Sequence, residues 1–256
     1  MKSFFRFFAV MAMFFAVSTL TAESSAADFL NQARKWRSPE KAETYAVLLG
    51  SINHLRRGSE PESWPISFRI IINKDSSTGQ LVVGTDEAYL LRHRSGEKYR
   101  NFATSAGKST VKLSRSGLKA SDLVLGFIFY ELEKELEKDS LGAGLIPCRV
   151  LLLYSKEHNE SAKVWFMENG AIPVRAEFCR SGEKKPYRTI EIVKGDKFDG
   201  LYCATRIKAS GPGWRTIVDF DREKSSCGIL KSKDQKVMLP LDEVYGSHRK
   251  IMETEK

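Results

Sequence analysis

The sequence predicts an α+β fold: a strongly curved antiparallel β-sheet with helices covering its concave side. Short stretches of alternating apolar and polar residues, roughly ten in number, run between turn residues along most of the chain. One amphipathic segment with helical spacing interrupts them, and a second helix-like segment precedes them. Because a long antiparallel sheet must bury one face, we expect the helices to lie on that face.

The first residues have the pattern of a secretory signal peptide. Lys2 and Arg6 precede the apolar run FFAVMAMFFAV, and small and polar residues follow it. The run is shorter than the about 20 apolar residues that a membrane-spanning helix needs, although an uncleaved anchor is the alternative. We expect cleavage after Ala26 or Ala27, and we expect the mature protein to lie in the periplasm.

The rest of the chain has the length and composition of one globular domain. We assign residues 1–27 to the signal peptide and residues 28–256 to a single domain, since no linker or repeat divides them. The net charge of +9 favours acidic partners such as anionic lipid head groups, or it is a basic surface that keeps the protein soluble. We expect a monomer, and no nucleic-acid partner outside the cytoplasm.

Two segments predict helices. The stretch DFLNQARKW starts at Asp28, which can cap a helix whose apolar side chains then fall on one side. The stretch from Asp122 to Lys138 follows Ser121, a good cap, and places Phe129, Leu132 and Leu136 at helical spacing. Two Glu–Lys pairs three residues apart add to the helical pattern of this second stretch.

Strand signals occupy most of the remaining chain. In ISFRIIINK, apolar and polar residues alternate with the period of a half-buried strand, apart from Ile71. The pair Asn169–Gly170 separates two apolar runs and predicts a tight hairpin. Strands therefore flank the second predicted helix on both sides.

The sequence contains no recognisable catalytic or metal-binding motif. The four histidines, His54, His93, His158 and His248, show no metal-ligand spacing, and there is no Gly-x-Ser-x-Gly elbow. The stretch GKST at 107–110 lacks the earlier glycine of a phosphate-binding loop, so we interpret it as a turn. We expect no enzyme activity and no cofactor.

Two other groups of residues leave alternatives open. The basic stretch LRHRSGEKYR, at 91–100, suits a phosphate or carboxylate contact, or a soluble hairpin loop. Four cysteines permit one or two disulfides or remain as buried thiols; these are Cys148, Cys179, Cys203 and Cys227.

The order of these parts resembles a known family. The stretches LLGSINHLRRG, PISFRIIINK and LKASDLVLGFIFYELEKE, followed by AKVWFMENGAIPVRAEFCRSGEK, resemble the outer-membrane lipoprotein-sorting proteins of the LolA/LolB-like superfamily. The resemblance covers most of residues 44 to 220. It implies a half-open β-barrel closed by helices, with an apolar cavity for lipid acyl chains.

Strand alternation predicts which residues would line such a cavity. Along each strand, the apolar residues on the side opposite the polar ones should face inward. In AKVWFME both faces are apolar, so either Trp165 and Met167 or Val164 and Phe166 face the cavity, and we favour the first pair. The predicted lining is Phe68, Ile70, Ile72, Leu81, Val83, Tyr89, Leu91, Trp165 and Met167.

The residues and the resemblance together predict a periplasmic carrier. It would bind lipid acyl chains or lipoproteins, take part in outer-membrane lipoprotein sorting, and contact membrane-bound partners transiently. The alternative is a structural or accessory protein of the cell envelope with the same fold and a filled core.

Overall fold

A computed structural model describes most of the chain. The described residues are 24–35, 43–74, 76–85, 87–94, 100–107, 111–142, 145–199, 201–231 and 236–240. In this part of the chain, no helix is long and apolar enough to cross a membrane.

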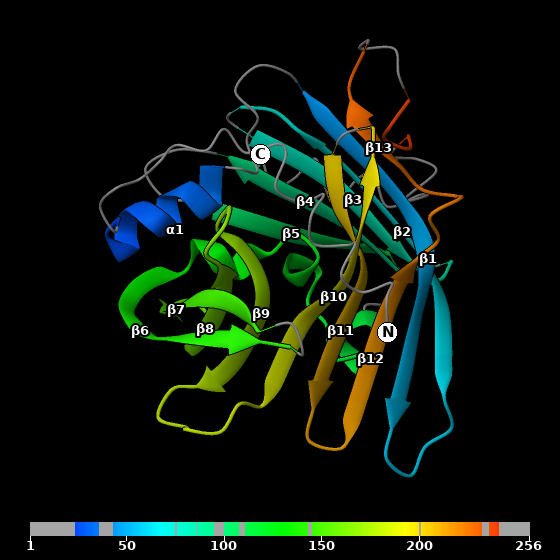
Figure 1. Cartoon of the computed structure of the whole chain (residues 1–256). Coiled ribbons are helices and arrows are strands. Elements are labelled where there is room, and N and C mark those ends of the chain that lie inside the picture. Colours follow the sequence, from blue (N-terminus) through cyan, green and yellow to red (C-terminus); the bar gives the residue numbers. More distant parts are fainter. Residues whose placement is uncertain are drawn as a thin grey trace.

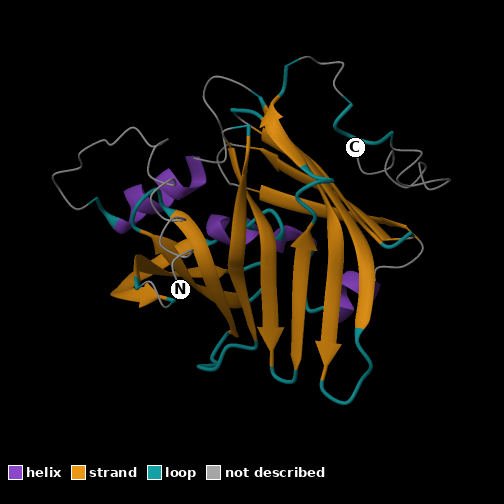
Figure 2. Ribbon diagram, turned by 45° about the vertical axis from the view of Figure 1, so that its right-hand side comes forward, coloured by secondary structure: helices purple, strands orange, loops and turns teal. Residues whose placement is uncertain are grey.

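Thirteen strands form one antiparallel sheet that bends strongly (Figures 1 and 2). Its strand order is β5-β4-β3-β2-β1-β12-β11-β10-β9-β8-β7-β6, and β13 pairs with β1 beside this path. Strands β5 and β6 are therefore the two ends, and the sheet is open. The strands are β1 (Thr44–Arg56), β2 (Glu62–Ile72), β3 (Ser76–Val83), β4 (Glu87–Arg94), β5 (Arg100–Gly107), β6 (Glu131–Leu141), β7 (Ile146–Ser155), β8 (Glu160–Met167), β9 (Ile172–Arg180), β10 (Arg188–Phe198), β11 (Leu201–Gly211), β12 (Trp214–Phe220) and β13 (Ser226–Ile229).

The first strand joins the two halves of the chain. The residues of β1 from Gly50 onward pair with β12, whereas its first residues pair with β13. A Cβ atom at Gly50 would lie 2.0 Å from the backbone oxygen of Asp219. A side chain at Gly50 would therefore push β1 and β12 apart, and the glycine permits their close approach.

The first helix, α1 (Ala26–Lys35), begins after a serine cap. The Ser25 hydroxyl accepts a hydrogen bond from the backbone N–H of Asp28 at 3.1 Å and donates to its carboxylate at 2.7 Å. Asp28 thus lies in the first turn, and Ser25 is the cap. Phe29, Leu30 and Ala33 are buried, while Trp36 lies outside the described residues.

The predicted helix over Asp122–Lys138 is wrong. The structure has the short helices α2 (Val111–Arg115), η1 (Ala120–Asp122) and η2 (Gly126–Phe129), and then the edge strand β6. Leu132 and Leu136 are four residues apart, which suits one helix face. A register shift after Leu132 instead turns these two leucines to opposite faces of the sheet. Pairing with β7 has overridden the local helical preference.

The other main features of the predicted fold agree with the structure. The antiparallel sheet is confirmed, and Asn169–Gly170 lies in the turn between β8 and β9. That helices close the concave side stays a prediction.

Candidate functional site

The inner face of the bent sheet is apolar over most of its strands. In β2, Ile66, Phe68 and Ile70 are buried, while Ser67 and Arg69 point to the other face, as alternation predicts. Inward side chains from both halves of the sheet form one continuous cluster. Among its largest members are Phe68, Leu81, Leu91, Leu151, Leu153, Phe166, Phe178 and Phe220.

The structure brings seven of the nine predicted lining residues to this cluster. Phe68, Ile70, Leu81, Val83 and Leu91 belong to it, and Ile72 and Tyr89 are half-buried against it.

The pair predicted on β8 lies elsewhere. Val164 and Phe166 belong to the main cluster, whereas Trp165 packs with Cys148 and Val150 in a separate cluster. The indole N–H of Trp165 donates to the Asp139 carboxylate at 2.9 Å. Met167 is buried, but outside both clusters. Of the two alternatives for this strand, Val164 and Phe166 are therefore the ones that share the cluster with Phe68.

The helix α1 contributes Phe29, Leu30 and Ala33 to the main apolar cluster. The ring of Phe29 meets the ring of Phe166 edge-on, with centroids 5.9 Å apart, and the Arg149 guanidinium lies 4.4 Å from the Phe29 centroid. Arg149 also donates to Ser24 at 3.0 Å. Arg34 donates to the backbone oxygens of Ile128 and Tyr130 at 3.0 and 2.9 Å. Side-chain packing of Phe29, Leu30 and Ala33 in the cluster therefore helps to hold α1 in place.

The segment that contains η1 and η2 also contributes to the cluster. Leu118, Val124, Phe127 and Ile128 are buried in it, and the Phe127 ring meets the Phe178 ring edge-on at 5.6 Å. Leu125 has a φ of 50°, which is uncommon for a leucine. Long runs of backbone pairing do not hold this segment, in contrast to the strands.

A network of buried charges joins this segment to the ends of β8 and β10. Asp122 and Arg188 form an ion pair of 2.6 Å, and both side chains are buried. The buried Glu160 carboxylate accepts hydrogen bonds from Lys119 at 2.8 Å, from Tyr130 at 2.6 Å and from Tyr187.

The hydrogen bonds of this network set the pKa of Glu160. Burial alone would raise it, but the donors Lys119, Tyr130 and Tyr187 outweigh burial and hold the pKa below its ordinary value. Sequence patterns could not indicate this network, because Asp122 and Arg188 are 66 residues apart.

Beside the network lies a polar hollow of about 440 Å³ at the turns between β7 and β8 and between β9 and β10. Lys119, Glu160, Arg180 and Tyr187 are among the residues that line it. Both signs of charge are present on its walls.

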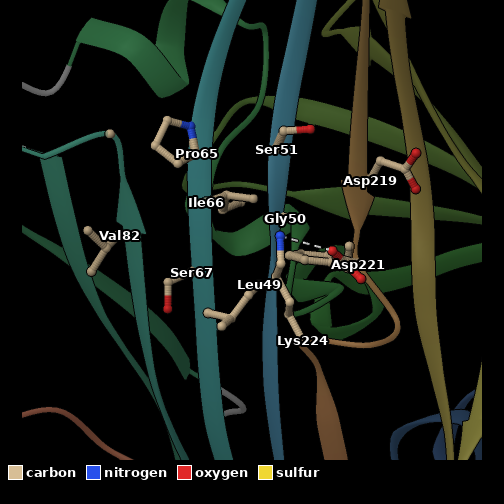
Figure 3. A pocket seen from close by; sticks show the side chains of 12 residues that line it. Leu49, Gly50, Ser51, Pro65, Ile66, Ser67, Val82, Asp219, Asp221 and Lys224 are labelled. Atoms are coloured by element: carbon tan, nitrogen blue, oxygen red, sulfur yellow. Dashed lines mark ion pairs between the residues drawn. The ribbon is translucent and has the colours of Figure 1, made fainter.

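A second hollow, of about 680 Å³, lies on the opposite face of β1, β2 and β12 (Figure 3). Leu49, Pro65 and Val82 line it, and Lys224 pairs with Asp221 at its edge, at 3.2 Å. The outer face nearby is partly covered, because Gln80 exchanges two 2.9 Å hydrogen bonds with the backbone of Leu239. Neither hollow is lined by Phe68, Ile70 or Leu81.

The remaining candidate groups from the sequence are the basic stretch, the cysteines and the possible metal ligands. In the basic stretch at 91–100, Arg92 is exposed and His93 stacks on Phe129, while residues 95–99 lie outside the described part. All four cysteines are free thiols. Burial raises the pKa of the Cys148 thiol to about 11, which keeps it protonated and unreactive at neutral pH. Among the described residues, no group of three or more His, Cys, Asp and Glu could hold a metal ion.

Comparison with known proteins shows similarity at the level of fold. No protein-family model and no curated protein sequence matches the chain. A DUF1329 family protein from Desulfovibrio piger is 15% identical with a TM-score of 0.59, over 88% of this chain and 99% of that one. A domain named for outer membrane lipoprotein sorting, from Vibrio parahaemolyticus, is 14% identical with a TM-score of 0.58, over 84% and 94%. This chain therefore shares the fold of these two proteins, and one of them is named for the lipoprotein sorting to which the sequence resemblance pointed.

Proposed function

We propose that this protein binds lipid acyl chains on the inner face of its sheet and acts as a carrier of lipids or lipoproteins in the periplasm. It reaches the periplasm through its signal peptide, works without a cofactor or a catalytic step, and meets membrane-bound partners transiently. The apolar inner face carries the proposal. It presents large side chains to α1 and to the segment containing η1 and η2, which side-chain packing holds in place.

The energetics of acyl binding fit such a surface. Each buried CH₂ group contributes about 0.8 kcal/mol, so a chain of a dozen carbons binds without any covalent step. The ligand would replace contacts that helical side chains such as Phe127 and Phe29 now make with the sheet. Entry therefore requires these segments to move, whereas the paired strands stay in place.

A matched pair of variants tests the proposal by titration with a fluorescent fatty acid. Ile70 is 5% exposed on the inner face, and its neighbour Ile71 is half-buried on the other face. We expect saturable binding to the wild type, roughly tenfold weaker binding to Ile70→Ala, and unchanged binding to Ile71→Ala.

Circular dichroism checks that both variants are folded. If Ile70→Ala does not fold, Ile70→Val is a milder change at the same position. Absence of saturable binding to the folded wild type would refute the proposal. The structural or accessory role would then be the better account of the filled core.

A further inference from the structure

We propose that Arg188 is the anchor for the carboxylate of a free fatty acid, so that the acyl ligand is held by a charged head as well as by its chain. This inference rests on the proposed function and names its ligand class. Arg188 is a buried arginine whose hydrogen-bonding capacity is only partly used.

One edge of the Arg188 guanidinium has no partner among the described residues. Nη1 donates to Asp122 at 2.6 Å, but Nε and Nη2 are buried and make no hydrogen bond to any described group. The side chain is 3% exposed. A buried donor without an acceptor is costly, so a group that accepts from both atoms would be bound favourably.

The same edge of another arginine shows which chemistry fits. Arg149 uses its Nε and Nη2 atoms to hold both carboxylate oxygens of Glu135, at 2.7 and 2.8 Å. This side-on fork is the bidentate geometry that guanidinium groups offer to carboxylates and phosphates. In Arg188 the same two nitrogens, Nε and Nη2, are buried and make no hydrogen bond to any described group. An anion with two oxygens would fit this pair of donors.

The surroundings of Arg188 favour an amphipathic ligand with a single negative charge. Its guanidinium lies 4.1 Å from the centroid of Phe178, a member of the apolar inner cluster. A carboxylate bound there would place the start of its chain beside this apolar cluster. Asp122 and Glu160 already lie near Arg188, so a phosphate dianion would meet more repulsion than a carboxylate monoanion does.

The Arg188 side chain stays protonated and positively charged. Burial alone would lower its pKa, but the charges of Asp122 and Glu160 outweigh burial and hold the pKa above its ordinary value. The polar hollow adjoins the network, since Lys119, Glu160 and Tyr187 line it. Its walls carry the cations Lys119 and Arg180 beside the carboxylates of Glu160 and Glu183.

Hexadecanoate and hexadecanol, which share one chain length, separate this inference from the proposed function. For the wild type, we expect hexadecanoate to bind roughly ten- to a hundredfold more tightly than hexadecanol at pH 8, measured by displacement of a fluorescent fatty acid. If neither ligand binds, the proposed function itself fails. If both bind equally, acyl binding stands and the carboxylate anchor is wrong.

Variants assign the preference to one residue. Arg188→Met alone would leave Asp122 buried and unpaired, so the test uses the double variant Arg188→Met with Asp122→Leu, which replaces the ion pair by apolar groups. Hexadecanoate should then bind no better than hexadecanol, while hexadecanol affinity is unchanged. The control is Arg206→Gln, which removes an exposed arginine paired with Asp219 on β12; it should keep the full preference. A preference that persists in the double variant overturns the inference.

Carbon-13 NMR adds a direct reading of the bound head group. Hexadecanoate labelled at its carboxyl carbon should titrate at lower pH on the wild type than in detergent micelles, because Arg188 stabilises the charged form. The same resonance should lose this downward shift on the double variant, and an unshifted titration on the wild type contradicts the anchor.

Discussion

At the residue scale, alternation alone identifies faces well where one face of a strand is polar. In β2, Ser67 and Arg69 mark the outer face, and Phe68 and Ile70 are buried inward as predicted. In β8 both faces are apolar, because Trp165 belongs to a second apolar cluster that residues of β6, β7, β8 and β9 form on the other face of the sheet. Sequence periodicity could not decide between the two faces there, and only the structure places Val164 and Phe166 inside.

Buried charges were the residues that sequence reasoning missed. Asp122, Glu160 and Arg188 come from separate segments and share no spacing that marks a site. They meet only because the segment containing η1 folds back onto the ends of β8 and β10. Long-range pairing of this kind has no local signal.

The Glu160 network predicts a pH dependence of stability. The pKa of Glu160 is depressed in the folded state, so its contribution is present above the ordinary value of 4.5 and is lost as pH falls through the folded pKa. Tyr187→Phe removes one donor to Glu160. We expect it to lower the free energy of unfolding by about 1 kcal/mol at pH 7 and by less at pH 3.

Urea unfolding of the wild type and of Tyr187→Phe at the two pH values measures this difference. An equal loss at pH 7 and pH 3 would mean that Tyr187 acts through packing alone. In that case its hydrogen bond does not stabilise the charged form of Glu160.

At the element scale, strand β6 shows why a helix was expected where none forms. Its acidic residues alternate with Leu132, Lys134 and Leu136, so the stretch has both helical and strand periodicity. Local propensity favours the helix, whereas pairing with β7 and the register shift favour the strand. A single sequence does not show which strand will pair with this stretch, so it could not decide between helix and strand.

The contacts at the start of α1 bear on where the mature chain begins. Sequence pattern alone favours cleavage after Ala26 or Ala27, yet Ser25 caps α1 and Ser24 binds Arg149. Losing such a cap costs about 1 kcal/mol. We therefore expect the mature chain to keep Ser24 and Ser25, with cleavage after Ala22.

N-terminal sequencing of the protein from its native host decides between the two positions. A chain that starts at Glu23 agrees with the contacts of α1. A chain that starts at Ala27 or Asp28 would show that the mature protein dispenses with the serine cap, and an intact Met1 would refute export by a cleaved signal peptide.

At the scale of the whole molecule, the sequence predicts the kind of fold better than its connectivity. Antiparallel hairpins follow from alternation and turn residues such as Asn169–Gly170, but the roughly ten strands expected from the sequence are fewer than the thirteen of the structure. The pairing of β1 with β12 could not be foreseen, because the two strands lie far apart in the sequence and no local pattern links them. That pairing turns two runs of hairpins into one bent sheet with a shared apolar inner face.

Photolabelling with a fatty acid carrying a diazirine near its methyl end tests the central claim most directly. After irradiation and proteolysis, mass spectrometry locates the labelled residues. We predict labels on inner-face side chains such as Phe68, Phe127 and Phe166, and their loss when excess unlabelled hexadecanoate competes. Labels confined to Leu49 and Val82 in the outer hollow, or labels that excess hexadecanoate does not displace, would contradict acyl binding on the inner face.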